Sequence, residues 1–126
     1  MRVGDTSILY ALFSENDIYH EKAVHEVKNP EIIFIPSEIW SETISLIHYR
    51  QGFTMAVKAG KALLDLPHVE LLGSRIDIIH SSWNQYQKMG DLSFPDCIVL
   101  EWCKEKNAIP LTCATSIKRS FEKNSL

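Results

Sequence analysis

The feature that most constrains this chain is an alternation of short apolar runs with longer segments of helical periodicity. The clearest short run is Ile-Ile-Phe-Ile at 32–35, which is typical of a strand that is buried on both faces. Other strand-like runs stand at 2–4, 69–72 and 108–113. Because parallel strands need long connections, which are usually helices, this alternation predicts an α/β fold with right-handed crossovers.

Helices are expected between these strands, and their ends are marked by capping residues, proline and glycine. The expected helical ranges are 7–14, 16–28, 36–51, 53–66, 75–88, 93–106 and 116–123. The chain has 126 residues, close to the commonest size of one domain, and no repeat or long linker divides it. We therefore predict one domain over residues 1–126, a three-layer sandwich with a central parallel sheet of four or five strands.

Composition excludes several classes of protein. With 45% hydrophobic and 23% charged residues, the chain resembles an ordinary soluble domain. The apolar run at 8–13 is far shorter than the roughly 20 residues of a membrane span, and it lacks the flanks of a signal peptide. Cys97, Cys103 and Cys113 have no metal-type spacing, and we expect them to be buried thiols. The sequence predicts a cytoplasmic protein that has no membrane partner.

The charge is unevenly distributed along the chain. A net charge of −3 disfavours a protein that coats nucleic acid by general electrostatic attraction. Residues 1–47 hold eight acids and three bases, whereas 48–90 and 98–126 each hold five bases and three acids. Asp91 and Asp96 lie between the two basic stretches. The positions of the acids are therefore more informative than their total.

Several acids are expected where predicted strands end. Asp5 follows the first strand, Glu38 and Glu42 lie in the first two turns of the helix after the second, and Asp96 lies in the first turn of the 93–106 helix. In open α/β sheets ligands bind outside the carboxyl ends of the strands, so these acids could converge there. Converging carboxylates repel one another, and a divalent cation relieves that repulsion. Oxygen ligands suit Mg²⁺ or Mn²⁺, and such a site serves metal-assisted phosphodiester hydrolysis.

Each acid also has a purely structural interpretation. Asp5 fits a helix N-cap, and Ser93 followed by Asp96 fits a capping box. Glu38 and Glu42 fit a solvated helix face, and Asp91 fits an exposed loop. No acid is specific by itself, and only their joint position at strand ends favours a metal site.

Three segments carry a family resemblance: Asp-Thr-Ser-Ile-Leu at 5–9, Pro-Ser-Glu-Ile-Trp-Ser-Glu at 36–42 and Leu-Ser-Phe-Pro-Asp-Cys at 92–97. Their order and spacing resemble a PIN domain over essentially the whole chain, in particular the short single-domain type found as VapC-like toxin nucleases. The resemblance implies an endoribonuclease that uses Mg²⁺ or Mn²⁺ to cleave single-stranded RNA. It assigns Asp5, Glu42 and Asp96 as the catalytic, metal-holding acids, whereas Glu38 matches no family acid. It also implies a small antitoxin protein as partner and a homodimer.

The chain departs from the family at the fourth acidic position. The family usually has Leu-Thr-x-Asp at the end of its last relevant strand, and here Ala114 stands in place of the Asp. The hydroxyls of Thr112, Thr115 and Ser116 could hold a metal-bound water instead, and Asp91 is a possible accessory acid. Ala114 keeps open the alternative of a degenerate PIN-like module that binds RNA or a protein without cleavage.

Substrate phosphates require cations near the acids. Lys118 and Arg119 follow the last predicted strand and are the expected phosphate-binding residues, while Arg50, Lys58 and Lys61 form a second basic set. A solvated surface is the structural alternative for both sets. A phosphatase with an aspartyl nucleophile is a third possibility, but Asp5 lacks the second Asp of that motif.

Overall fold

The computed structural model describes residues 1–124 and contains a four-stranded parallel sheet with the order β3-β2-β1-β4. The strands are β1 (Arg2–Gly4), β2 (Ile33–Pro36), β3 (Val69–Leu72) and β4 (Ile109–Leu111). The predicted parallel α/β fold is therefore confirmed, and four strands form the sheet.

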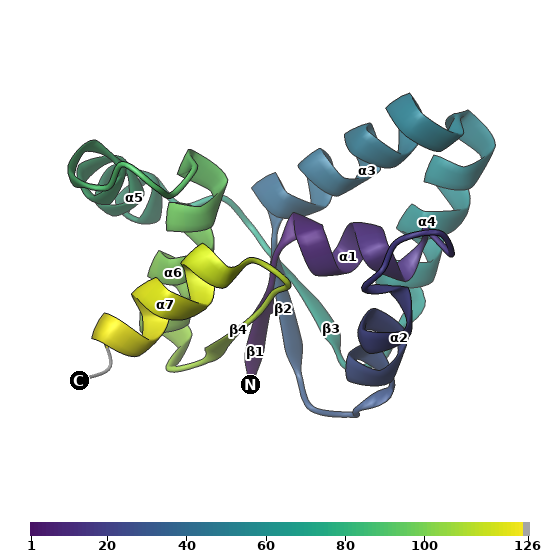
Figure 1. Cartoon of the computed structure of the whole chain (residues 1–126), viewed down its shortest axis with the longest axis horizontal. Helices are drawn as coiled ribbons and strands as arrows, with labels where there is room; N and C mark the ends of the chain where they lie inside the picture. Colours follow the sequence, from purple (N-terminus) through teal and green to yellow (C-terminus); the bar gives the residue numbers. More distant parts are fainter. Residues whose placement is uncertain (125–126) are drawn as a thin grey trace.

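Helices cover both faces of the sheet and make three layers, with α5, α6 and α7 on one side and α1 to α4 on the other (Figure 1). Their bounds are α1 (Thr6–Leu12), α2 (His20–Lys28), α3 (Ser37–Gln51), α4 (Phe53–Asp65), α5 (Ile76–Lys88), α6 (Phe94–Lys106) and α7 (Thr115–Asn124). None of the helices in the described part of the chain combines the length and the hydropathy that crossing a bilayer requires.

The core lies between the sheet and the helices that flank it. All four residues of β2 are buried, as expected for an inner strand with helices on both faces. Ile8 and Leu9 of α1 and Val99 of α6 are fully buried in the same core. Burying side chains of this size contributes about 1.5–3 kcal/mol each, so packing on the sheet holds the first turn of α1 and the second turn of α6 in fixed places.

Arg2 ties the beginning of β1 to the end of α2. Its guanidinium is buried and donates hydrogen bonds to the carbonyl oxygens of Glu26 at 2.6 Å, Asn29 at 3.1 Å and Glu31 at 2.6 Å. These acceptors include carbonyls at the end of a helix, which lack partners within the helix itself. Arg2 therefore has a structural role.

Helix α2 begins later than the sequence predicts, at His20 rather than near residue 16. Asp17 organises a turn before it, because its side chain accepts a hydrogen bond from the Tyr19 N–H at 2.8 Å and its carbonyl accepts one from the His20 N–H at 3.0 Å. The His20 ring then contacts the Ala11 carbonyl oxygen at 2.8 Å. The turn and this ring contact fix the beginning of α2 against the end of α1.

The strand order identifies where a ligand site is expected. From β1 the chain continues to β2 on one side and returns later to β4 on the other, so the order reverses between β1 and β4. Ligands of open α/β sheets bind at such a reversal, outside the carboxyl ends of the strands. Asp5 directly follows β1 there, and Thr112 directly follows β4.

Candidate functional site

Asp5 is a buried carboxylate at the carboxyl end of β1, and only 4% of its surface is exposed. One of its oxygens, Oδ1, accepts hydrogen bonds from the Ser7 hydroxyl at 2.7 Å and from the Ile8 N–H at 3.1 Å, so Asp5 also caps α1. The other, Oδ2, accepts a hydrogen bond from the Thr112 hydroxyl. No Lys, Arg or His in the described part of the chain makes an ion pair with this carboxylate.

Burial raises the pKa of the Asp5 carboxyl above its ordinary value, since the charged form loses hydration. Hydrogen bonds from Thr112, Ser7 and Ile8 lower that pKa and offset part of the effect, whereas the nearby charge of Asp96 raises it. An ionised carboxylate in this place is therefore under-compensated by the protein, and a cation would stabilise it.

The segment 112–114 is held against Asp5 by a small hydroxyl network. The Thr112 hydroxyl accepts a hydrogen bond from the Ala114 N–H at 2.9 Å while it donates to Asp5. The Ser7 hydroxyl accepts one from the Cys113 N–H at 3.0 Å while it donates to Asp5. Both hydroxyls thus link the end of β4 to Asp5, which shows a structural reason for threonine at position 112.

Glu42 lies on an exposed face of α3, one turn into the helix, and its Oε1 accepts a hydrogen bond from the Thr6 hydroxyl. Thr6 is the residue next to Asp5 and begins α1. The Glu42 carboxylate is therefore beside the carboxyl end of β1. The Glu38 carboxylate instead accepts a hydrogen bond from the Ser74 hydroxyl at 2.9 Å.

Asp96 lies in the first turn of α6 and completes the predicted capping box. Its Oδ2 accepts a hydrogen bond from the Ser93 N–H at 3.0 Å, and the Ser93 hydroxyl accepts one from the Asp96 N–H at 3.3 Å. The charge of Asp96 also raises the pKa of Asp5, so the two carboxylates are close enough to repel one another. Capping uses one oxygen and leaves the other for a ligand, so the two interpretations of Asp96 are compatible.

The donor chemistry of these three acids fits a hard divalent cation. Within residues 1–124, no group of three or more His, Cys, Asp or Glu side chains is arranged to surround one ion. Mg²⁺, however, is commonly bound through one or two carboxylates and completes its octahedral shell with waters and substrate phosphates. The buried, under-compensated carboxylate of Asp5 is suited to be one of these ligands.

Most of the other residues predicted for the site lie away from the three acids. Asp91 and Arg119 line a surface hollow between the end of α5 and α7 together with Lys88 and Lys123, and none of the three acids lines it. Thr115 is exposed, Ser116 is half-buried, and neither hydroxyl donates a hydrogen bond to the three acids in the described part of the chain. Of the four hydroxyl and acidic residues predicted as accessories, only Thr112 contacts Asp5.

The pKa of Lys118 is influenced by Asp5 and also by a second lysine that the sequence did not indicate. The nearby Lys22, on α2, lowers the pKa of the Lys118 ammonium, while the charge of Asp5 raises it. Lys22 was missed because helix periodicity shows it only as one more charged residue on an exposed face. The turn at Asp17 sets where α2 begins, and no motif marks that turn as part of a site.

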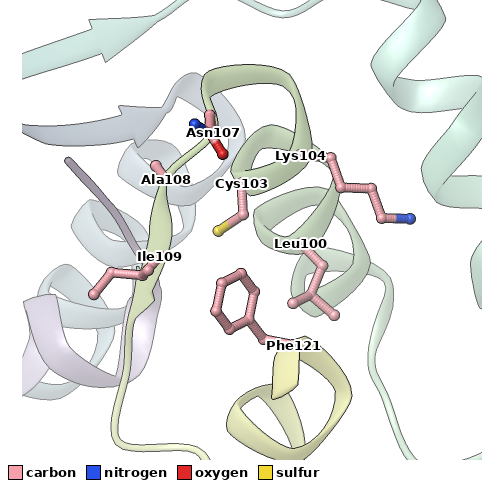
Figure 2. A pocket seen from close by; sticks show the side chains of 7 residues that line it. All are labelled: Leu100, Cys103, Lys104, Asn107, Ala108, Ile109 and Phe121. Atoms are coloured by element: carbon pink, nitrogen blue, oxygen red, sulfur yellow. The ribbon is translucent and has the colours of Figure 1, made fainter. Parts of the chain in front are cut away.

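A pocket of about 240 Å³ lies between α6, β4 and α7 and is distinct from the site (Figure 2). Its lining residues are Leu100, Cys103, Lys104, Asn107, Ala108, Ile109 and Phe121. Ala108 and Ile109 stand at the beginning of β4, whereas Thr112 follows its end. The pocket has mostly apolar walls and no carboxylate, so it offers no ligand for a metal.

The three thiols give no alternative chemistry. Burial raises the pKa of Cys97 to about 11 and that of Cys103 to about 12, and it also raises the pKa of the half-buried Cys113. A thiol is a nucleophile only as the thiolate, so these cysteines are unsuited to attack a substrate at neutral pH.

Comparison with known proteins identifies the family and the fold. The sequence model of the PIN domain family matches residues 3–119. Among solved structures, the chain is similar to the crystal structure of VapC20 from Mycobacterium tuberculosis, a toxin that cleaves the sarcin–ricin loop, with a TM-score of 0.86, 20% identity and 95% of each chain covered. At that identity the likeness concerns the fold. No curated protein matches the chain.

Proposed function

Because the chain belongs to the PIN domain family, we propose that it is a metal-dependent endoribonuclease, a single PIN domain over residues 1–126 that acts as the toxin of a toxin–antitoxin pair. The observation that carries the proposal is the buried Asp5 carboxylate at the reversal of strand order, with the carboxylates of Glu42 and Asp96 beside it. Similarity to VapC20, an RNA-cleaving toxin, supports RNA as the substrate.

Asp5, Glu42 and Asp96 would hold Mg²⁺ or Mn²⁺ in this proposal. A bound divalent cation supplies activation of water and stabilisation of the leaving oxygen in phosphodiester hydrolysis. The hydroxyls of Thr112 and Ser7 fix the direction of the Asp5 carboxylate, since each donates to one of its oxygens. We propose that Lys118, whose pKa the charge of Asp5 raises, attracts a substrate phosphate.

Two exposed apolar surfaces support the proposed protein partners. A groove of about 290 Å³ between α3 and α4 is lined mainly by apolar side chains, among them Trp40, Ile44 and Leu64, and suits an apolar segment of an antitoxin. On α5, Ile76 is 72% exposed and Trp83 is 50% exposed, and this flank suits contact with a second copy. We propose that toxin, antitoxin and RNA meet in the cytoplasm, where thiols such as Cys113 stay reduced.

The alternative is a PIN domain that binds RNA or a protein without cutting. Ala114 favours it, because a methyl group stands where the family usually has a fourth acid. Removing one carboxylate lowers the affinity of the site for a divalent cation, since that affinity depends on the charge and number of the oxygen ligands.

Incubation of the purified protein with labelled single-stranded RNA distinguishes the two functions. We expect RNA cleavage with Mn²⁺ or Mg²⁺ and none with a chelator. Intact RNA under every metal condition, with protein shown to be folded by circular dichroism and free of antitoxin, contradicts the nuclease and favours the non-catalytic module.

A further inference from the structure

A hollow with charged walls lies on the surface between the end of α5 and α7, which stand on the same side of the sheet (Figure 1). It has a volume of about 410 Å³, and we call it the basic hollow. Its charged lining residues are Lys88, Asp91, Arg119 and Lys123. Three cations and one acid give its walls a net charge of +2, so the hollow favours an anion as its ligand.

Within residues 1–124, no ion pair neutralises the cations of the basic hollow. The ion pairs in that range involve neither Lys88, Arg119 nor Lys123. Asp91 lines the same hollow and forms no ion pair in that range either. Cations that gather in one hollow repel one another, and a bound anion relieves that repulsion.

A buried hydroxyl belongs to the same walls. Ser120 lines the hollow and is only 7% exposed, and its Oγ has no hydrogen-bond partner among the described residues. A buried polar group without a partner costs free energy, and most such groups in native proteins do have a partner. Because a serine hydroxyl can donate to an anion, an anion in the hollow would provide the acceptor that Ser120 lacks.

Apolar packing joins the basic hollow to the Asp5 site. Met89, in the wall of the hollow, packs against a buried cluster that includes Leu92, and Ala114 packs against the same cluster. Ala114 belongs to the segment 112–114, which donates a hydrogen bond to Asp5 through its threonine. The hollow and the site therefore lie on one rigid unit.

Two short stretches of chain also connect the hollow with the acids. Asp91 precedes Asp96 by five residues, which span at most about 18 Å when the chain is extended. Arg119 follows Thr115, the first residue of α7, by four residues, or about 6 Å along the helix. A strand of a few nucleotides can therefore reach from the acids to the basic hollow.

We propose that the basic hollow binds a backbone phosphate of the RNA strand, a few nucleotides from the bond that is cleaved. The planar guanidinium of Arg119 suits two phosphate oxygens, and the Ser120 hydroxyl donates a further hydrogen bond. Lys88 and Lys123 add charge from α5 and α7. The hollow thus contributes to RNA affinity away from the acids. This inference rests on the proposed function for the identity of the ligand as RNA.

A binding measurement without metal tests the hollow separately from cleavage. The Kd of a labelled single-stranded RNA is measured by fluorescence anisotropy in EDTA over a series of KCl concentrations. Lys28→Gln and Lys58→Gln are the matched controls, because they remove exposed lysines from α2 and α4 on the other side of the sheet. The variants of the hollow are Lys88→Gln, Arg119→Gln, Lys123→Gln, the combination of these three, Arg119→Lys, Asp91→Asn and Ser120→Ala.

We expect each loss of a cation from the hollow to weaken RNA binding about three- to tenfold, and the controls to stay within about twofold. In the combined variant the slope of log K against log salt should fall by about 0.7, the value for one lost phosphate contact on a single strand. Arg119→Lys should restore only part of the affinity, because an ammonium lacks the planar fork of the guanidinium. Asp91→Asn should strengthen binding about two- to threefold, since it removes a negative charge from the walls.

Ser120→Ala adds a measurement that separates a ligand from a structural residue. The variant removes a buried hydroxyl that has no partner in the described part of the chain, so its melting temperature should be no lower than that of the wild type. Its RNA binding should weaken about threefold. A lower melting temperature with an unchanged Kd would assign Ser120 to packing and contradict its place in the hollow.

The outcomes distinguish this inference from the proposed function. Cation variants that match the controls in both Kd and salt slope contradict the RNA site and leave the nuclease proposal intact. If inorganic phosphate then still shifts the amide resonances of Gly90 and Ser120 in an NMR titration, the hollow is a site for free phosphate and the assignment to RNA is wrong. Wild-type protein that cleaves no RNA with any metal, yet binds it through the hollow, supports the inference and contradicts the nuclease.

Discussion

Replacing Thr112 by Val tests whether the hydroxyl network around Asp5 contributes to the free energy of unfolding as its geometry indicates. Valine has nearly the same shape, and Thr112 is only 3% exposed, so the substitution removes the hydroxyl with little change in packing. The buried Asp5 carboxylate then loses the hydrogen bond to Oδ2, and the Ala114 N–H loses its acceptor at 2.9 Å. A hydrogen bond to a charged group contributes about 1.5–3 kcal/mol, so we expect the free energy of unfolding to fall by about 2 kcal/mol at pH 7.

The pH dependence of this loss identifies its cause. The Thr112 hydrogen bond lowers the pKa of Asp5, so its contribution is present when Asp5 is ionised and disappears as the pH falls through the pKa of that carboxyl. Urea unfolding of Thr112→Val and of the matched variant Thr112→Ser should therefore differ most at pH 7, and the difference should shrink at acidic pH to the part that comes from the Ala114 N–H. Equal stability of the two variants at pH 7, or a difference that is independent of pH, would refute this reasoning.

Three other perturbations have defined outcomes. Asp5→Asn should raise the thermal stability of the metal-free protein at neutral pH. Burial raises the pKa of Asp5, so the folded wild-type protein loses stability as the pH rises through that pKa, and the neutral amide avoids this loss. Differential scanning fluorimetry in EDTA and in Mn²⁺ should show that Mn²⁺ stabilises only the wild type. Ala114→Asp should bind Mn²⁺ about tenfold more tightly in calorimetric titration, because it adds one charge to the site, and unchanged affinity would place position 114 outside it. Arg2→Met should lower the free energy of unfolding by about 3 kcal/mol, since three carbonyls lose a charged donor, and a loss under 1 kcal/mol would mean that water replaces the guanidinium.

Local patterns were sufficient to predict most of the fold. The apolar run that forms β2 and the Ser93–Asp96 capping box depend on neighbouring residues alone, and both are found where the sequence predicts them. Because strands and helices alternate along the chain, the parallel sheet could also be predicted. The beginning of α2 was placed too early because the turn before it depends on hydrogen bonds to Asp17, which helix periodicity does not reveal.

Contacts between distant segments limited the prediction of the site. Position at a strand end indicated Asp5, and the structure adds that Thr112 and Ser7 hold its two oxygens. Lys118 and Arg119 were equivalent in the sequence, but the charge of Asp5 raises the pKa of Lys118, whereas Arg119 lines the hollow beside Asp91. Lys22, which lowers the pKa of Lys118, lies far from it in the sequence, so no local pattern could indicate it.

The rate of RNA cleavage by Asp5→Asn tests the central claim most directly, namely that the carboxyl end of β1 is a metal-dependent nuclease site. The single-turnover rate with Mn²⁺ is measured for the wild type, for Asp5→Asn and for Glu38→Gln, which alters an acid of α3 whose carboxylate accepts a hydrogen bond from Ser74. A metal ion stabilises the transition state by several kcal/mol, so we expect the rate of Asp5→Asn to fall at least about 100-fold while Glu38→Gln stays near the wild-type rate. Cleavage by Asp5→Asn within about threefold of the wild type would contradict the account.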